Sequence, residues 1–316
     1  MGLLSTARIN AAITAAAADV DEVEVVAVAS RDAARAHAHA TALGVPRALG
    51  SYEALLEDPD VDAVYVSVPN GLHVPWTLRA LAAGKHVLCE KPLSRRPAEV
   101  ERAFDAAERA ALVLTEGFMW RHHPQTARLV SLLDVIGTVR MVRAAFSFPL
   151  AGPDVRLAAS LDGGSLMDVG CYCVGAIRLV CGEPELVTAQ QILGGDGVDV
   201  RMAATLRFRG GALAHLDCGF DIAARDELEV AGERGVLRLG DPWHAWAPGI
   251  EVRGADGSTE RLEVETADAY ALELRDLAAA IANGREPLVG RADAIGQART
   301  IAALYESAAT GRAVAP

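Results

Sequence analysis

The sequence predicts an α/β protein of two domains: a Rossmann-like domain with a parallel sheet over residues 1–118, and an α+β domain with a large, open, mainly antiparallel sheet over residues 119–316. Short β-rich runs alternate with helical runs through the first part, which is typical of βαβ units. Strands joined by Gly-rich turns follow in the second part with no helix between them, and these indicate antiparallel pairing. A length of 316 residues, 51% of them apolar, is enough for two hydrophobic cores.

The first domain is expected to begin with a short strand at Gly2-Leu3-Leu4 and to continue as three strand–helix pairs. In each pair, a run rich in β-branched residues precedes a run with helical spacing. The expected pairs are residues 23–29 with 33–43, 63–68 with 72–83, and 86–89 with 98–111. The strands of such units are parallel, so their carboxyl ends meet at one edge of the sheet.

The second domain is expected to open with a helix over 123–133, a strand over 139–148 and a helix over 164–180, with Gly182 and Pro184 as stop signals. Four strands follow, over residues 186–193, 198–208, 212–220 and 227–230. Two helices, 268–282 and 292–309, end the chain. These last helices are candidates for packing back on the first domain.

Composition excludes several classes of protein. A formal net charge of -12, without any basic stripe, disfavours nucleic acid and acidic membrane surfaces as partners. No apolar run approaches a membrane-spanning segment and the amino terminus lacks a secretory pattern, so a cytoplasmic location is expected. The five cysteines include no C-x-x-C pair, which argues against a disulfide framework or a zinc site; no metal is expected.

Two motifs supply an acid/base set. Glu90-Lys91-Pro92 follows an apolar strand, which places Lys91 at the ligand-binding edge of the sheet, and Asp168 and Tyr172 lie four residues apart on one helix face. Proton exchange on a carbinol oxygen needs a group that titrates near neutral pH, and an ammonium beside a phenol lowers the phenol's pKa. Each motif alone has a plain alternative, a surface turn for the lysine and a core position for the tyrosine. Their joint occurrence favours Lys91, Tyr172 and Asp168 as catalytic residues.

The turn after the first strand is the weaker part of a dinucleotide site. A phosphate-binding turn needs small residues where the backbone approaches the pyrophosphate. None of the three expected glycines is present, and a plain helix start capped by Ser5 or Thr6 is an equal alternative. The first strand is also about three residues shorter than usual, so low cofactor affinity is expected. The candidate cofactor residues here are Ser5, Thr6, Ala7, Arg8 and Ile9.

The ends of the next strands indicate NADP in preference to NAD. Ser30 and Arg31 stand where an NAD site usually has an acid, and a hydroxyl with a guanidinium can hold a ribose 2′-phosphate. Asp32 leaves room for NAD, and Arg31 as a solvated helix-start residue is the alternative. Pro69, Asn70 and His73 are placed where the ribose and nicotinamide would pass; the alternative has Asn70 as a helix cap and His73 packed beneath the turn.

These stretches together resemble the glucose–fructose oxidoreductase / inositol dehydrogenase (Gfo/Idh/MocA) family over essentially the whole chain. The resemblance rests on Val28–Arg31, Pro69-Asn70-x-x-His73, Ala83–Pro92 and Gly163-Gly164-x-x-x-Asp168-x-Gly170-x-Tyr172. It implies a two-domain oxidoreductase that uses a nicotinamide cofactor on sugars, cyclitols or related diols.

The resemblance also implies roles for single residues. Lys91 matches the catalytic lysine, with Glu90 and Pro92 beside the nicotinamide ribose, and Asp168 matches the acid that binds substrate hydroxyls. Tyr172 stands where many members have a histidine, as in the branch of dihydrodiol and xylose dehydrogenases and deoxysugar ketoreductases, in which tyrosine donates the proton. The expected substrate-binding residues are Lys91, Arg121, Asp168 and Tyr172.

The expected function is hydride transfer between NADP or NAD and a carbinol or ketone carbon of a sugar-like or diol substrate. Two alternatives stay open, a deoxysugar ketoreductase of a biosynthetic pathway and a non-catalytic, cofactor-sensing regulatory protein. The resemblance implies a homodimer or homotetramer formed through the carboxy-terminal sheet, with the outer face of residues 198–220 involved.

Overall fold

The computed structural model describes residues 1–316, which form two compact units. The first unit contains Met1–Met119 and Asp268–Ile295, and the second contains Trp120–Ala267 and Gly296–Pro316. The chain therefore returns to the first unit for its next-to-last helix, and the third and last crossing between the units falls inside the last helix.

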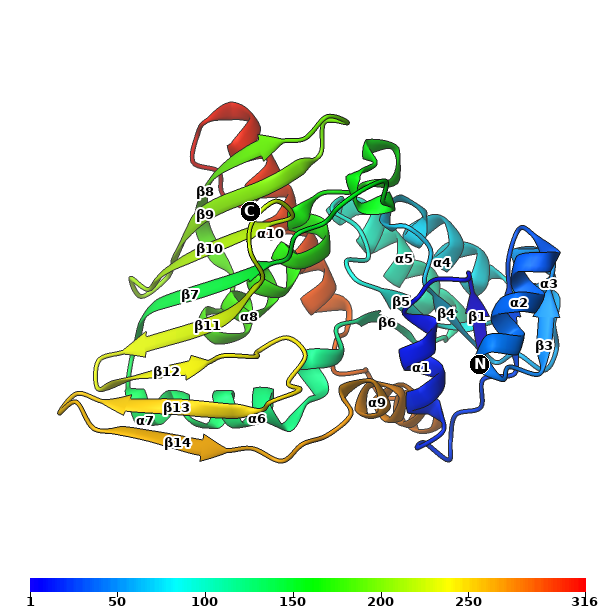
Figure 1. Cartoon of the computed structure of the whole chain (residues 1–316), viewed down its shortest axis with the longest axis horizontal. Coiled ribbons are helices and arrows are strands. Elements are labelled where there is room, and N and C mark those ends of the chain that lie inside the picture. The colour runs from blue at the N-terminus through cyan, green and yellow to red at the C-terminus, as the bar shows by residue number, and fades with distance from the viewer. The chain divides into compact units, whose positions relative to one another are not determined.

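The first unit is built on a six-stranded parallel sheet with the strand order β3-β2-β1-β4-β5-β6 (Figure 1). The connections run outward in opposite directions from β1 and β4, as in doubly wound dinucleotide-binding sheets. This confirms the expected Rossmann-like architecture. Its elements are β1 (Gly2–Leu4), α1 (Asn10–Ala17), β2 (Ala27–Ala29), α2 (Ala33–Leu43), β3 (Arg47–Leu49), α3 (Tyr52–Glu57), β4 (Ala63–Val66), α4 (His73–Ala82), β5 (His86–Glu90), α5 (Pro97–Ala110), β6 (Leu114–Gly117) and α9 (Ala269–Asn283).

Three elements of this unit were not expected from the sequence: β3, α3 and β6. Strand β3 has only three residues, all half-buried, so it lacks an apolar run. Helix α3 has six residues and begins at Ser51, whose side chain accepts the Ala54 N–H at 3.1 Å. Strand β6 buries Thr115 and Glu116, which breaks the apolar pattern on which strand prediction depends.

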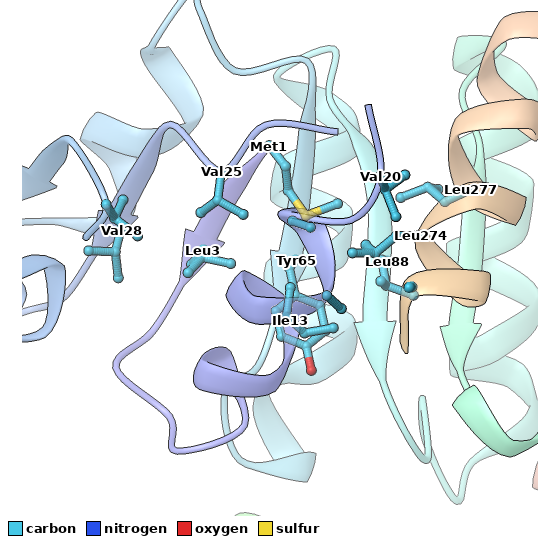
Figure 2. Packing of buried hydrophobic residues seen from close by; sticks show 14 of the residues in the cluster. Met1, Leu3, Ile13, Val20, Val25, Val28, Tyr65, Leu88, Leu274 and Leu277 are labelled. Atoms are coloured by element: carbon cyan, nitrogen blue, oxygen red, sulfur yellow. The ribbon is translucent and has the colours of Figure 1, made fainter. Parts of the chain in front are cut away.

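The core of the first unit lies between the sheet and the helices α1 and α9. Leu3, Tyr65 and Leu88 occupy adjacent positions on β1, β4 and β5 and are fully buried. Figure 2 shows Ile13 of α1 and Leu274 of α9 among the residues packed around them. Each buried apolar side chain of this size contributes about 1.5–3 kcal/mol, so this cluster fixes α9 to the first unit.

The short first strand is anchored at its start. Met1 is 8% exposed and belongs to the same apolar cluster (Figure 2). Its α-amino group donates to the carbonyl oxygen of Glu24 at 2.6 Å. Burial lowers the pKa of this amino group, against the opposing effect of the nearby acids Asp62 and Glu24.

The second unit is built on an eight-stranded sheet with the order β14-β13-β12-β11-β7-β10-β9-β8 (Figure 1). All neighbouring strands are antiparallel except β7 and β10, which confirms a mainly antiparallel sheet. Its elements are α6 (Pro124–Ser131), α7 (Leu133–Ile136), β7 (Val139–Ser147), α8 (Cys171–Cys181), β8 (Pro184–Leu193), β9 (Asp199–Phe208), β10 (Leu213–Gly219), β11 (Arg225–Gly232), β12 (Gly235–Leu239), β13 (Gly249–Gly254), β14 (Thr259–Glu263) and α10 (Arg291–Thr310).

Three expectations for this unit need correction. The helix expected over 164–180 is a π-helical turn, Leu166–Gly170, followed by α8. Pro184 is the first residue of β8 and not only a helix stop, which an edge strand tolerates because it needs no N–H there. Strands β12, β13 and β14 were not expected, since their sequences mix charged and glycine residues with few apolar ones.

One stretch is long and apolar enough by composition to cross a membrane, contrary to the sequence expectation. It covers Ala159–Cys181, with a mean hydropathy of 1.4 in its most apolar window. In the structure 78% of that window is buried. Burial of this kind is typical of a core helix, and α8 lies against β7 and β10.

Candidate active site

The candidate cofactor residues lie at the carboxyl ends of four neighbouring parallel strands of the first unit. Residues 5–9 follow β1, Ser30-Arg31 follows β2, Pro69-Asn70 follows β4, and Glu90-Lys91-Pro92 ends β5. Because β1 and β4 are neighbours whose connections leave in opposite directions, this edge holds the crevice in which doubly wound sheets bind ligands. The structure therefore brings these candidates to one edge of one sheet.

The turn after β1 adopts a glycine-like conformation without a glycine. Ser5 has φ 146°, in the half of conformational space that residues with a side chain avoid. Helix α1 begins only at Asn10, and its amino-terminal cap, Ile9, makes no side-chain cap bond. The alternative of a helix start capped by Ser5 or Thr6 is therefore wrong.

A buried hydrogen-bond network holds Ser5 in this conformation. Its Oγ lies 2.9 and 2.8 Å from the carbonyl and hydroxyl oxygens of Ser67 and accepts the Ala7 N–H at 3.0 Å. Asn10 completes the network: its Nδ2 donates to the Ser5 carbonyl, and its Oδ1 accepts from the Ser67 hydroxyl, both at 2.8 Å. Ser67 and Asn10 were missed by sequence reasoning, which searched this turn for glycines alone.

The end of β2 carries two arginines and an acid that is already engaged. Asp32 caps α2, and its Oδ1 accepts the N–H groups of Ala34 and Arg35 at 2.8 and 3.1 Å. Arg31 is exposed and its guanidinium faces the Tyr52 hydroxyl. The Arg35 Nη2 donates to Thr6 Oγ1, in the turn after β1, at 3.3 Å. The sequence analysis missed Arg35, which lies in the first turn of α2, four residues after Arg31.

The loop after β5 is held from two sides by buried side chains. The Lys91–Pro92 peptide bond is cis. The Leu93 N–H donates to Glu116 Oε1 at 2.6 Å, and the His73 Nδ1 lies 2.9 Å from the Pro92 carbonyl oxygen. These contacts fix the backbone that directly follows the lysine. Glu116 was missed because a buried acid in a short strand has no periodic signal.

His73 is 1% exposed, and both of its ring nitrogens face backbone carbonyl groups. The Nε2 lies 2.8 Å from the Val68 oxygen, so the ring joins the end of β4 to the Lys91 loop. Burial, with the charge of Lys91, lowers the pKa of His73 to about 4, against the effect of the two carbonyl contacts. These contacts give His73 a positioning role under the loop, while contact between its ring and a cofactor stays a prediction. The alternative of Asn70 as the cap of α4 is wrong, since Leu72 is that cap.

In the second unit, three glycines explain the spacing of the motif around Asp168. A Cβ on Gly163 would lie 2.3 Å from the Arg156 carbonyl oxygen, and one on Gly170 would lie 2.8 Å from the Cys218 Sγ. Gly164 has φ 122°, and its Cβ would lie 2.1 Å from the Asp199 Oδ1. Glycine is therefore required at each position because a neighbouring group fills the space.

Asp199 of β9 anchors the π-helical turn through hydrogen bonds. It is 1% exposed and accepts hydrogen bonds from Ser165 Oγ and the Leu166 N–H, each at 2.7 Å, and from the Tyr305 hydroxyl at 2.8 Å. Burial raises the pKa of Asp199, while these donors oppose the shift. The turn that carries Asp168 is thus fixed to β9 and α10. Turns of this wide type often occur at functional sites.

Asp168 is paired with an arginine that the sequence analysis missed. The Arg156 Nε donates to Asp168 Oδ2 at 2.7 Å, and Arg156 Nη1 lies 3.3 Å from Asp154 Oδ1. Burial lowers the pKa of Arg156, but the two carboxylates outweigh it and the net shift is upward. The Asp168 side chain remains 15% exposed. It is therefore a partly accessible carboxylate with a fixed orientation.

Tyr172 is 6% exposed and lies within an aromatic cluster of the second unit. The Phe146 ring stands edge-on to it with the centroids 5.4 Å apart, and Trp243 lies at 6.0 Å. The Trp243 Nε1 donates to the Ala145 carbonyl oxygen at 3.1 Å, which fixes the loop after β12 to β7. The phenol thus has an apolar, rigid surround.

The segment between the units holds the remaining substrate candidate. Arg121 is half-buried, with its guanidinium carbon 5.6 Å from the centroid of the Trp120 ring. His123 is buried and caps α6, since its Nδ1 accepts the Gln125 N–H at 3.0 Å.

One group of side chains has the spacing of metal ligands, although none was expected from the sequence. Ligand atoms of Asp226, Asp241 and His244 lie within 4.8 Å of one another. The Asp241 oxygens also accept N–H groups of its own loop, from Ala245 at 3.0 Å and Ala247 at 3.1 Å. Burial, with the Asp241 charge, raises the pKa of Asp226 to about 6. Asp241 thus shapes its own loop through these two bonds.

The parallel sheet of the first unit, with polar groups at its crossover edge, defines the class of dinucleotide-binding oxidoreductases. Within this class, the profile of an oxidoreductase family with an NAD-binding Rossmann fold (GFO_IDH_MocA) matches residues 3–118. The profile of the GFO/IDH/MocA C-terminal domain matches residues 126–238. The chain belongs to the Gfo/Idh/MocA oxidoreductase family, as its motifs indicated.

Individual relatives match over most of the chain. D-xylose 1-dehydrogenase (NADP(+)) 2 of Haloferax volcanii is 41% identical over 278 residues, which are 86% of this chain and 86% of that protein. A trans-1,2-dihydrobenzene-1,2-diol dehydrogenase of Danio rerio is 36% identical over 65% of this chain and 62% of that protein. Among solved structures, the 3-ketoreductase KijD10 of Actinomadura kijaniata in complex with NADP and TDP-benzene superposes with a TM-score of 0.91 at 34% identity, covering 97% of this chain and 96% of that one. These relatives belong to the branch that the sequence resembled.

Proposed function

We propose that this enzyme transfers a hydride between NADP and a carbinol or ketone carbon of a sugar-like or diol substrate. The observation that carries the proposal is the Lys91 loop, which is fixed by Glu116 and His73 at the crossover edge of the dinucleotide-binding sheet. Relatives named for NADP-dependent sugar oxidation and for ketosugar reduction support the same chemistry.

The presence of a lysine at position 91 is informative, because lysine is rare in this chain. Of 30 Lys and Arg residues only two, Lys85 and Lys91, are lysines. Arginine cannot release a proton in a protein, whereas a lysine ammonium can donate one and changes its pKa readily with its surroundings. Lys85 has a structural role, because its Nζ donates to the Asp58 carbonyl oxygen at 2.8 Å. Lys91 therefore carries the second of the two side-chain amines in this chain.

The proposed mechanism divides the proton and the charge between two residues. Tyr172 exchanges the proton with the substrate oxygen, and the Lys91 ammonium polarises that oxygen. The Asp168 carboxylate, oriented by Arg156, accepts a hydrogen bond from a neighbouring substrate hydroxyl. The nicotinamide, when bound, accepts or supplies the hydride. Arg121 is proposed to contribute a donor to the same substrate.

The residues at the end of β2 fit NADP better than NAD. The Asp32 carboxylate is engaged as the cap of α2, so the acid that left room for NAD has another role. Arg31 precedes the cap of that helix and Arg35 lies in its first turn; both are exposed cations, and Arg35 contacts Thr6 of the phosphate turn. A ribose 2′-phosphate needs such cations, because guanidinium groups bind phosphate in bidentate geometry. Ser5 supplies the glycine-like backbone that lets a turn approach the pyrophosphate.

A titration with NADPH and NADH, followed by fluorescence, tests the cofactor. We expect NADPH to bind more tightly, and Arg31→Ala to weaken NADPH binding by about 10-fold or more while NADH binding changes little. Arg109→Ala, an exposed arginine of α5, is the matched control. Equal binding of both cofactors by the parent, unaffected by Arg31→Ala, would contradict the NADP assignment.

A substrate screen over aldoses, cyclitols and keto-sugars tests the reaction. Positioned acid/base groups contribute roughly 10²–10⁴ in rate, so we expect Tyr172→Phe and Lys91→Ala to lose activity by that factor. Lys91→Arg keeps the charge but not the titratable amine and is expected to recover little. Turnover within a few-fold of the parent in these variants would remove the catalytic assignment.

A deoxysugar ketoreductase is the second candidate within the same chemistry. The superposition with KijD10 over 97% of this chain supports it. A dTDP-linked ketosugar in the screen separates this candidate from a free-sugar dehydrogenase. A cofactor-sensing regulatory protein would bind NADPH but turn over none of the substrates.

A second copy of the chain is the proposed partner, through the open face of the eight-stranded sheet. A groove of about 720 Å³ on this face is lined by Met141, Thr205, Leu213 and neighbouring residues. Charged residues line it as well, and among them Arg143 and Glu229 form an ion pair at 3.7 Å. Interfaces between protein chains combine apolar contacts with polar pairs of this kind. A sedimentation experiment that finds only monomer would contradict the proposed self-association. We also propose a cytoplasmic location for the protein.

A further inference from the structure

Two carboxyl groups lie next to the Lys91 loop in the interior of the first unit. Glu273 of α9 is 3% exposed, and its Oε1 is buried with no hydrogen-bond partner. Glu90, the residue before Lys91, accepts a short hydrogen bond from the Tyr65 hydroxyl at its Oε1. The mechanism above uses neither Glu273 nor Tyr65. A buried acid without partners near a catalytic loop calls for an explanation.

The fold places these side chains on one face of the sheet. Tyr65 pairs in register with Leu88, and Glu90 follows Leu88 by two residues, so all three point to the same side. That side is covered by α9, since Leu274 belongs to the same apolar cluster as Tyr65 and Leu88. Figure 2 shows Tyr65 in this cluster, with its hydroxyl at the end of the ring remote from Met1. Glu273 is the residue before Leu274 and enters the same interior.

Glu90 and Glu273 interact electrostatically, and the burial of Glu273 leaves little water on its side to screen the interaction. Burial and the Glu90 charge raise the pKa of Glu273 well above its usual value, with a further contribution from Asp276. Asp276 itself is paired with Arg285 at 2.6 Å and stays on the outer side of α9. Burial and Glu90 also raise the pKa of Tyr65, with smaller effects of Glu273 and Tyr270, so the phenol stays a hydrogen-bond donor.

We propose that Glu273 is a positioning residue that acts on Lys91 through Glu90: the buried carboxyl group of Glu273 and the half-buried one of Glu90 hold one proton and one negative charge between them, and the Tyr65 hydroxyl keeps that charge on Glu90. Like charges at such a site do not both ionise, as in coupled carboxyl pairs generally. The pair therefore supplies one fixed anion at the residue that precedes Lys91. This inference rests on the proposed function only in treating Lys91 as the group that polarises the substrate.

The arrangement gives Glu273 a role that an apolar residue could not fill. If Glu90 is neutralised, Glu273 can carry the charge in its place, because a lone acid loses the repulsion of its neighbour. The charge beside Lys91 is thus retained as long as one of the two acids remains. Loss of both removes the anion and makes the ammonium easier to deprotonate.

The two-lysine composition permits a direct test on the cofactor-free, full-length protein. Labelling with ¹³C-lysine gives signals from Lys85 and Lys91 alone, and the side-chain carbon next to each amine reports its titration. Lys85, held by the Asp58 carbonyl oxygen, is the internal control. The variants are Glu90→Gln, Glu273→Gln and the double variant, with Glu306→Gln on the exposed face of α10 as the matched control.

Each single variant is expected to lower the titration midpoint of Lys91 by less than about half a pH unit, and the double variant by clearly more than the sum of both. The midpoint of Lys85 stays unchanged in all of them. Shifts that simply add, or a Glu273→Gln substitution without effect in either background, would overturn the proposal. The titration of Lys91 needs no turnover. A protein that fails to catalyse the proposed reaction can therefore still confirm or contradict the proposed role of Glu273, and the two failures are distinguishable.

Tyr65→Phe provides a second measurement that preserves the packing volume. Without the phenol oxygen the charge can move to Glu273, so the Lys91 midpoint is expected to fall. Adding Glu273→Gln is expected to restore it, because the charge then has only Glu90 to occupy. A purely structural role for Glu273 predicts no such rescue, and its absence would also overturn the proposal. Thermal unfolding confirms that each variant is folded.

Discussion

The Arg156 Nε donates to Asp168 Oδ2 at 2.7 Å, and this pair ties the segment after β7 to the π-helical turn that precedes Tyr172. The pair is partly accessible, with exposed side-chain fractions of 35% for Arg156 and 15% for Asp168. It orients the one carboxylate that we assign to substrate hydroxyls. The orientation of Asp168 Oδ2 therefore depends on Arg156, a residue twelve positions earlier in the chain.

Substitution of Arg156 by Gln is expected to lower kcat/KM by about 10- to 100-fold, because a charged hydrogen bond contributes about 1.5–3 kcal/mol. Solvent screening limits the loss of stability to about 1 kcal/mol or less. Arg140→Gln, which breaks the exposed pair with Glu233, is the matched control and should change neither quantity. Steady-state kinetics on the best substrate and thermal unfolding measure both effects. A kcat/KM equal to that of the control would contradict the orienting role.

Gly164→Ala is expected to be among the most destabilising substitutions in the second unit. The new Cβ would lie 2.1 Å from Asp199 Oδ1, and the residue has φ 122°. We expect a loss of about 3 kcal/mol or more, since both strain and a broken buried network contribute. Gly182→Ala is the matched control: it has φ 78° but nothing within 4 Å of the added atom. Its cost should be about 1 kcal/mol, and equal losses in urea unfolding would show that the Asp199 contact is unimportant.

The two-domain architecture and most long elements were predictable because their periodicity is strong. Strand β9, for example, alternates exposed and buried residues over 201–208. The π-helical turn at Leu166–Gly170 was not predictable, since its apolar pattern matches an ordinary helix and the wider turn is imposed by Asp199. Short elements such as β3 lack enough residues for any period to show.

The candidate site was predictable where a motif joins a residue type to a strand end, as for Lys91. The residues that hold the site were not. Glu116 and Arg156 act through contacts with residues 23 and 12 positions away in the sequence, and a single buried acid or an arginine in a loop has no local signature. At Ser5 the sequence was misleading, because the conformation of a glycine is produced there by a network that includes Ser67.

Replacement of Ser5 separates strain from hydrogen bonding in the turn after β1. Ser5→Ala keeps the unfavourable φ of 146° and removes the hydroxyl that lies 2.8 Å from Ser67 Oγ. It should cost about 1–3 kcal/mol. Ser5→Gly loses the same bonds but relieves the strain, so its cost should be smaller by about 1 kcal/mol. Urea unfolding measures both; an alanine variant as stable as the glycine variant would mean that the backbone of Ser5 is unstrained.

Acid stability is expected to depend on His73. Its pKa in the folded protein is about 4, below the ordinary value of 6.5, so the folded state favours the neutral ring. The stabilisation is fully present above pH 6.5 and is lost as the pH falls from there toward 4, because the unfolded chain takes up a proton that the folded chain does not. The total loss is about 3 kcal/mol for one fully buried group. Other buried histidines, such as His123, add to the same trend.

The difference between variants isolates the contribution of His73. His73→Gln keeps an amide donor for one of the two carbonyl groups, so it should fold but be less stable at pH 7 by about 1–2 kcal/mol. Its free energy of unfolding should fall less steeply between pH 6.5 and 4 than that of the parent, by about 1 kcal/mol per pH unit. His37→Gln, on the exposed face of α2, should follow the parent. Parallel curves for the parent and His73→Gln would mean that the ring is already protonated in the folded state, bonded to both the Val68 and Pro92 oxygens as a cation.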